Sequence, residues 1–106
     1  MLPPLELVRR RLSELMENPE PVMRQLVRIS IDGGTFCPGL QFLPGGQLQP
    51  TVFGLFRRAM ELEIPHNYFT VWMVALSREL AGSRPVDHLK TNPVPLLRAL
   101  ETFRWR

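Results

Sequence analysis

The chain reads WMVALSRELAGSRPVDHL from Trp72 to Leu89, and this stretch decides the fold. An apolar helical pattern runs up to Gly82, which we expect to end the helix at a positive φ that glycine adopts without strain. Ser83 follows as an expected N-cap, and Pro85 lies in the first turn of a new short helix, where an N–H is not needed. The stretch therefore predicts two helices joined by a tight corner, with Trp72 buried in the core.

Similar borders divide the rest of the chain into short helices. Apolar residues recur at three- and four-residue steps, which is typical of amphipathic helices. Pro50 opens one of them, Asn67 is a plausible N-cap for the next, and Asn92 followed by Pro93 starts the last. The expected helices cover residues 4–17, 20–28, 50–61, 67–81, 85–90 and 93–103.

The apolar period changes to two around residues 27–37. Val27 to Ile31 alternates, Asp32-Gly33-Gly34 has the composition of a hairpin turn, and Thr35 to Cys37 could return as a strand. We therefore expect a mainly α protein of five or six short helices with one small β-hairpin near residues 28–37. A helical segment of residues 1–27 would precede residues 28–106 within a single compact domain.

Composition places the chain among ordinary globular proteins. Its 106 residues suffice for one core, and its shares of 44% hydrophobic and 22% charged residues are typical values. No apolar run approaches the ~20 residues of a membrane helix, and the N-terminal region lacks the apolar segment of a signal peptide. The single cysteine, Cys37, rules out an internal disulfide. These features predict a cytoplasmic protein.

Residues that carry catalysis are scarce. Cys37, His66 and His88 are the chain's only thiol and imidazole side chains, and their spacing fits no zinc motif. A cysteine beside a turn and two surface histidines explain them more simply than a Cys–His nucleophile does. The glycine pairs have no phosphate-loop context. We therefore expect no enzyme, no metal and no cofactor.

The basic residues are almost all arginine. The net charge is +3, and twelve of the thirteen basic residues are arginine, Lys90 being the exception. A codon bias explains this most simply. The other interpretation is contact with phosphates or carboxylates, which arginine binds in bidentate geometry.

Trp105 lies between Arg104 and Arg106 at the end of the sequence. Two interpretations stay open: the indole folds back on the surface of the domain, or it protrudes with the arginines as an anchor for a partner. Tryptophan and arginine are enriched at binding hot spots.

Three features resemble a known family when taken in order. They are the hairpin with the following Pro38-Gly39-Leu40-Gln41-Phe42 segment, the helix carrying Trp72, and the corner from Leu80 to Leu89 with its closing helix. Residues 28–104 thereby resemble the toxin-binding domain of Xre/MbcA/ParS-type bacterial antitoxins. The two short helices of residues 1–27 are too few for the complete helix-turn-helix domain that members usually carry.

The resemblance implies a non-catalytic module that neutralises a protein partner by covering its active site. In this family the partner is typically a RES-type toxin that consumes NAD or transfers from it. Carried over to this chain, the resemblance implies binding through the corner, the last helix and the tail. The residues concerned are Arg84, Asp87, Arg98, Arg104, Trp105 and Arg106.

Two other functions remain open from the residues alone. One is a small DNA-associated transcriptional regulator with an arginine-rich phosphate-contacting face. The other is an oligomeric accessory or structural protein, for which a homodimer is possible. The face of the regulator would consist of Arg9, Arg10, Arg11, Arg24 and Arg28.

Overall fold

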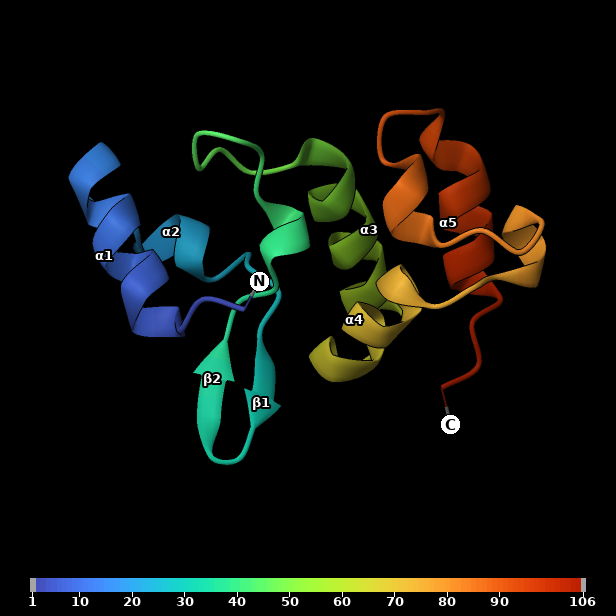
Figure 1. Cartoon of the computed structure of the whole chain (residues 1–106), viewed down its shortest axis with the longest axis horizontal. Coiled ribbons are helices and arrows are strands. Elements are labelled where there is room, and N and C mark those ends of the chain that lie inside the picture. Colours follow the sequence, from blue (N-terminus) through green and yellow to red (C-terminus); the bar gives the residue numbers. More distant parts are fainter. Residues whose placement is uncertain (1, 106) are drawn as a thin grey trace.

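The computed structural model describes residues 2–105, which form five α-helices, three 3-10 helices and one antiparallel hairpin (Figure 1). In chain order the elements are α1 (Leu5–Leu15), α2 (Glu20–Met23), β1 (Ile29–Ile31), β2 (Gly34–Phe36), η1 (Gly39–Gln41), α3 (Pro50–Glu61), α4 (His66–Val74), η2 (Arg78–Leu80), η3 (Pro85–His88) and α5 (Pro93–Glu101). The mainly α fold with one small hairpin is confirmed. Within residues 2–105, no helix combines the length and the apolar character needed to span a bilayer.

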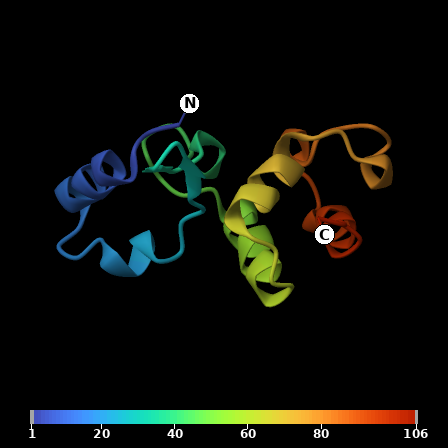
Figure 2. The same ribbon diagram turned by 90° about the horizontal axis from the view of Figure 1, so that it is seen from below.

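The elements form two lobes along the longest axis of a molecule that measures 40 × 30 × 24 Å. The N-terminal lobe, residues 2–48, holds α1, α2, the hairpin and η1, and the C-terminal lobe, residues 49–105, holds the remaining elements (Figures 1 and 2). Contacts between β1 and the start of α4 help to join the two lobes.

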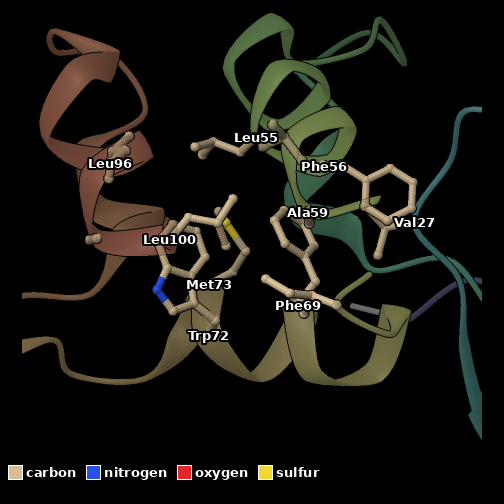
Figure 3. Packing of buried hydrophobic residues seen from close by; sticks show 12 residues of the cluster. Val27, Leu55, Phe56, Ala59, Phe69, Trp72, Met73, Leu96 and Leu100 are labelled. Atoms are coloured by element: carbon tan, nitrogen blue, oxygen red, sulfur yellow. The ribbon is translucent and has the colours of Figure 1, made fainter. Parts of the chain in front are cut away.

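The C-terminal lobe has the larger core, which Figure 3 shows in close-up. Helices α3, α4 and α5 each contribute buried side chains, and Val27 enters the same cluster from the N-terminal lobe. The Phe69 ring lies between Phe56 and Trp72, with centroid distances of 5.4 and 5.9 Å. Trp72 is only 4% exposed, so its predicted place in the core is confirmed.

The N-terminal lobe has a smaller core of its own. Val8 and Leu12 from α1 pack against Met23, Leu26 and Cys37. Its members come from both sides of position 27. The N-terminal lobe therefore extends beyond the division that the sequence suggested between residues 1–27 and 28–106.

The hairpin forms where the sequence predicted it. Ile29 pairs with Phe36, and Ile31 pairs with Gly34, across a two-residue turn. Asp32 and Gly33 both have positive φ, at 48° and 80°, which is the conformation of the type I′ turns that match strand twist.

The buried side chain of Gln41 holds the backbone of Val27, whose own side chain lies in the core of the C-terminal lobe. Its Oε1 accepts from the Val27 N–H at 2.8 Å, and its Nε2 donates to the Val27 carbonyl at 3.0 Å. The same Nε2 also donates to the Pro38 carbonyl, and the Gln41 carbonyl accepts from the Gln49 N–H at 2.8 Å. The side-chain amide thus pairs with Val27 as a neighbouring strand would.

The helix starts that the sequence predicted at Pro50 and Pro93 are both found in the structure. Helix α3 covers Pro50–Glu61, the predicted range, and the side chain of Gln49 caps its first turn. Helix α5 begins at Pro93, and Asn92 Oδ1 accepts from the Val94 N–H as expected. The helix expected over 20–28 ends at Met23, however, because the chain turns there to reach β1.

The helix expected to reach Ala81 ends at Val74, and this prediction was wrong. Ser77 instead forms an isolated antiparallel bridge with Ser83, closed by a 2.9 Å hydrogen bond from the Ser77 N–H to the Ser83 carbonyl. The loop reverses at Ala81 and Gly82, whose φ values are 56° and 82°. This early reversal brings η2 and η3 back onto α5.

The corner contains three predicted features with different outcomes. Gly82 has the expected positive φ, although it turns a bridged loop and does not follow a long α-helix. Pro85 opens η3 as expected. Ser83 is not the N-cap, because Arg84 takes that position and the Ser83 backbone is used in the bridge to Ser77.

Candidate protein-interaction surface

The corner holds an ion pair between two of the predicted partner-binding residues. Arg84 Nε and Nη2 donate to the two carboxylate oxygens of Asp87, each at 3.0 Å. The Arg84 guanidinium holds the pKa of Asp87 below its ordinary value. A partner carboxylate that binds Arg84 must therefore compete with Asp87.

The C-terminal tail folds back onto the protein. The Trp105 ring lies 5.7 Å from the Tyr68 ring, and the indole packs beside the core of the C-terminal lobe. Of the two interpretations open from the sequence, the structure supports the folded-back indole. The protruding anchor was wrong, because the apolar surface beside α4 and α5 covers part of the ring.

The predicted partner-binding residues do not all meet in one place. Figure 1 shows η3 beside the first turn of α5, whereas the tail leaves the last turn of that helix. Asp87 belongs to η3 and Arg84 directly precedes it. Arg98 and Arg104 are exposed at that second end. Arg106 lies outside the described residues.

The outer side of α4 exposes apolar side chains that sequence periodicity did not single out. Successive residues advance by about 100° around a helix, so Val71 and Val74 point about 100–160° away from the buried Phe69 and Trp72. Tyr68, one turn before Trp72, lies at the edge between the buried and the exposed sides. Val71 is 56% exposed, and Leu76, just beyond the helix, is 75% exposed. We call Tyr68, Val71, Val74 and Leu76 the α4 face.

Apolar periodicity over residues 67–81 predicts burial of Val71, Ala75 and Leu76 together with Trp72, and for these three residues the prediction was wrong because all three are exposed. Nearly every position of α4 from Tyr68 to Val74 is apolar, so the helix has no polar side to turn toward water. A two-lobed chain of this size covers only one side of such a helix. This all-round apolar composition was the signal in the sequence that pointed to an uncovered face.

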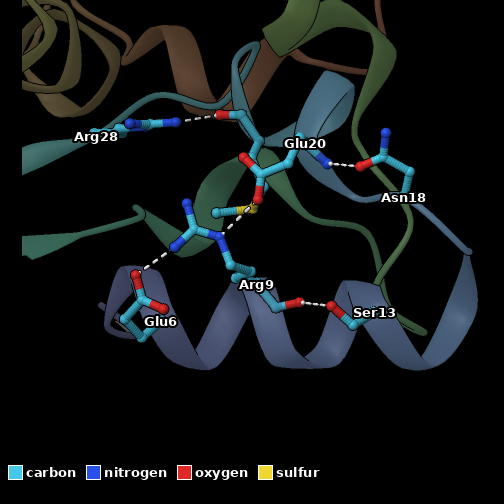
Figure 4. Close-up of polar contacts among 7 residues, drawn as sticks. Glu6, Arg9, Ser13, Asn18, Glu20 and Arg28 are labelled. Atoms are coloured by element: carbon cyan, nitrogen blue, oxygen red, sulfur yellow. Dashed lines mark hydrogen bonds and ion pairs between the residues drawn. The ribbon is translucent and has the colours of Figure 1, made fainter.

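The arginines proposed for DNA contact are partly engaged within the N-terminal lobe. Arg9 pairs with Glu6 and, through Nε at 2.9 Å, with Glu20 (Figure 4). The Arg28 guanidinium donates to the Met23 carbonyl at 2.6 Å. Arg10, Arg11 and Arg24 stay exposed. Two of the five arginines are thus already paired within the N-terminal lobe, which argues against the use of all five as a phosphate-contacting face.

His66 has a structural hydrogen bond at the junction of the lobes. Its Nδ1 accepts from the Arg28 N–H at 2.9 Å, so the neutral ring carries its proton on Nε2. Burial, and secondarily the charge of Arg28, lowers the pKa of His66. Next to it, Asn67 exchanges two hydrogen bonds with the Ser30 backbone, at 3.2 and 3.4 Å, and is not an N-cap.

Cys37 lies in the smaller core. It is fully buried, and burial raises the pKa of its thiol. A buried thiol with a raised pKa is a poor nucleophile. Among residues 2–105, no three His, Cys, Asp or Glu side chains are grouped so that they could hold a metal ion.

Comparisons with protein-family models, with curated proteins and with solved structures find no match to this chain.

Proposed function

We propose that this protein is a non-catalytic interaction module that binds a protein partner through the α4 face. The observation that carries the proposal is a row of large apolar side chains on one side of a well-packed helix. Clustered apolar side chains of this kind mark interaction sites, whereas apolar residues scattered singly do not.

The surroundings of the face indicate the chemistry of the partner. Arg78, two residues after Leu76, lines the same hollow of about 170 Å³ at one end of the face. Glu79 also lines this hollow, and its carboxylate accepts from the Ser77 hydroxyl at 3.1 Å. Exposed Arg104 adjoins Trp105, which contacts Tyr68 at the other end. An apolar centre with basic residues at its rim is complementary to a partner patch that has an apolar centre and acidic residues around it.

The resemblance to Xre/MbcA/ParS-type antitoxins supplies the proposed partner, a RES-type toxin. The α4 face would bind beside the toxin's active site and thereby block access of NAD. Arg84, Arg98 and Arg104 would contribute secondary contacts to carboxylates or phosphates. Asp87 would hold Arg84 in a defined orientation until a partner carboxylate replaces it.

The test titrates this protein with a purified RES-type toxin, which we expect to be encoded beside this protein's gene. Val71→Glu places a charge in the centre of the face, and Val94→Glu is the matched control, because Val94 is 44% exposed on α5 outside the face. We expect Val71→Glu to weaken binding at least about tenfold, which corresponds to ~1.4 kcal/mol. It should equally reduce inhibition of NAD consumption, while Val94→Glu binds like the wild type.

Two results would overturn the proposal. Equal affinities of Val71→Glu and wild type would show that the α4 face is not the interface. A wild-type dimer that Val71→Glu converts to monomer, without any toxin binding, would assign the face to contact between copies. Light scattering and calorimetric titration of the same samples distinguish these outcomes.

A further inference from the structure

A second apolar surface lies in the N-terminal lobe, far along the chain from the α4 face. A groove of about 370 Å³ separates α1 from the loop of residues 39–46. Val8, Leu12 and Leu15 line its α1 side, and Phe42 and Leu43 line the opposite wall. Its volume falls within the range of about 300–1,000 Å³ that is typical of ligand pockets.

The sequence of α1 specifies more burial than the fold provides. Leu5, Val8, Leu12 and Leu15 form one apolar stripe, and Val8 and Leu12 at its middle are buried in the smaller core. Leu15 continues the same stripe but is 67% exposed at the mouth of the groove. The last turn of this stripe therefore lacks the cover that its pattern indicates.

The positive charge of Arg11 at the groove indicates that its occupant carries an acidic group. Arg11 is the only charged residue among those that line it. Arg9, two residues earlier, is paired with Glu6 and Glu20. Within residues 2–105 the Arg11 guanidinium, by contrast, has no carboxylate partner.

We propose that this groove binds a short apolar segment of a protein partner that carries an aspartate or glutamate next to its apolar anchors. The apolar side chains would pack on Leu12, Leu15 and Phe42, and the carboxylate would pair with Arg11 at the rim. A second copy of this chain fits less well, because a symmetric contact centred on the groove brings two Arg11 side chains together. The site is independent of the α4 face.

The test starts from a random-sequence peptide display library selected against the full chain. We expect the selected peptides to combine large apolar residues with an acidic residue at a fixed spacing. Their binding should shift the methyl resonances of Val8, Leu12 and Leu15. Leu15→Asp, at an exposed position that leaves the fold intact, should weaken binding by about tenfold or more.

A charge exchange tests the role of Arg11. Arg11→Glu should weaken a selected peptide about tenfold, and replacing the acidic residue of that peptide by lysine should restore its affinity. Arg10→Glu makes the same charge change at an exposed position about 100° around α1 and outside the groove, and it should leave binding unaltered.

Three results would overturn the proposal. One is equal weakening by Arg11→Glu and Arg10→Glu, and another is peptide contacts that map to the α4 face. The third is a concentration-dependent dimer that Leu15→Asp dissociates, which would assign the groove to a second copy.

Discussion

Protonation of His66 should loosen the junction between the lobes in mildly acidic solution. The neutral ring accepts the Arg28 N–H at 2.9 Å, and a protonated ring carries a proton on both nitrogens and so loses this bond. A partly buried N–H left without an acceptor costs about 1–2 kcal/mol. For a domain of this size, that loss corresponds to a decrease in Tm of roughly 4–8 °C per kcal/mol.

The direction in which pH changes the stability follows from the lowered pKa of His66. Because the folded protein holds the pKa of His66 below its unfolded value, the stabilisation is fully present above about pH 6.5. It is lost as the pH falls from there through the folded pKa, since the unfolded chain binds the proton more readily.

Urea unfolding between pH 7.5 and 5 measures the effect. His66→Asn keeps an acceptor near the position of Nδ1 but does not titrate, so its stability should change less across this range. His88→Asn removes the other histidine, away from the junction, and should keep the wild-type pH dependence. Equal pH dependence in wild type and His66→Asn, or a His66 pKa at or above 6.5 by NMR titration, would refute the reasoning.

Three further substitutions test the fold. Gln41→Leu leaves both polar groups of Val27 without partners, so it should destabilise by about 2–4 kcal/mol in urea unfolding, whereas the exposed Gln47→Leu should have little effect. Trp105→Ala should lower stability by about 1–2 kcal/mol, less than the loss of a fully buried aromatic, and an unchanged Tm would mean that the indole does not pack on Tyr68. Gly82→Val should cost about 1–3 kcal/mol because φ is +82° there, and wild-type stability would contradict this turn geometry.

Features set by local chemistry could be predicted from the sequence. The starts of α3 and α5 follow from Pro50 and Pro93, because proline fixes φ and needs no N–H in the first turn of a helix. The hairpin follows from Asp32-Gly33, whose residues tolerate the positive φ of its turn.

Features that depend on contacts between residues distant in the sequence could not be predicted from the sequence. Helix α4 ends seven residues early because Ser77 pairs with Ser83, a competition that apolar periodicity does not describe. The role of Gln41 depends on backbone groups of Val27, fourteen residues away. Trp105 could be placed only once Tyr68 was known to lie beside the tail.

For the candidate surface, the sequence pointed to the corner, the last helix and the tail, and not to the exposed side of α4. Periodicity assigns an apolar residue to the core whenever its helix has an apolar stripe. Leu15 and Leu76 fit such stripes but are exposed, because burial depends on how much surface the neighbouring elements cover.

The amide of Gln41 has a mechanical consequence for binding. It holds Val27, whose side chain packs in the core of the C-terminal lobe, against Pro38 in the N-terminal lobe, and so helps to fix the spacing between the groove beside α1 and the α4 face. A partner that touches both lobes makes its second contact as an intramolecular step, and the resulting avidity depends on how well the spacing is preserved. Substitution of Gln41 should therefore reduce the avidity of a two-site partner while leaving the affinity of each site for a short peptide unchanged.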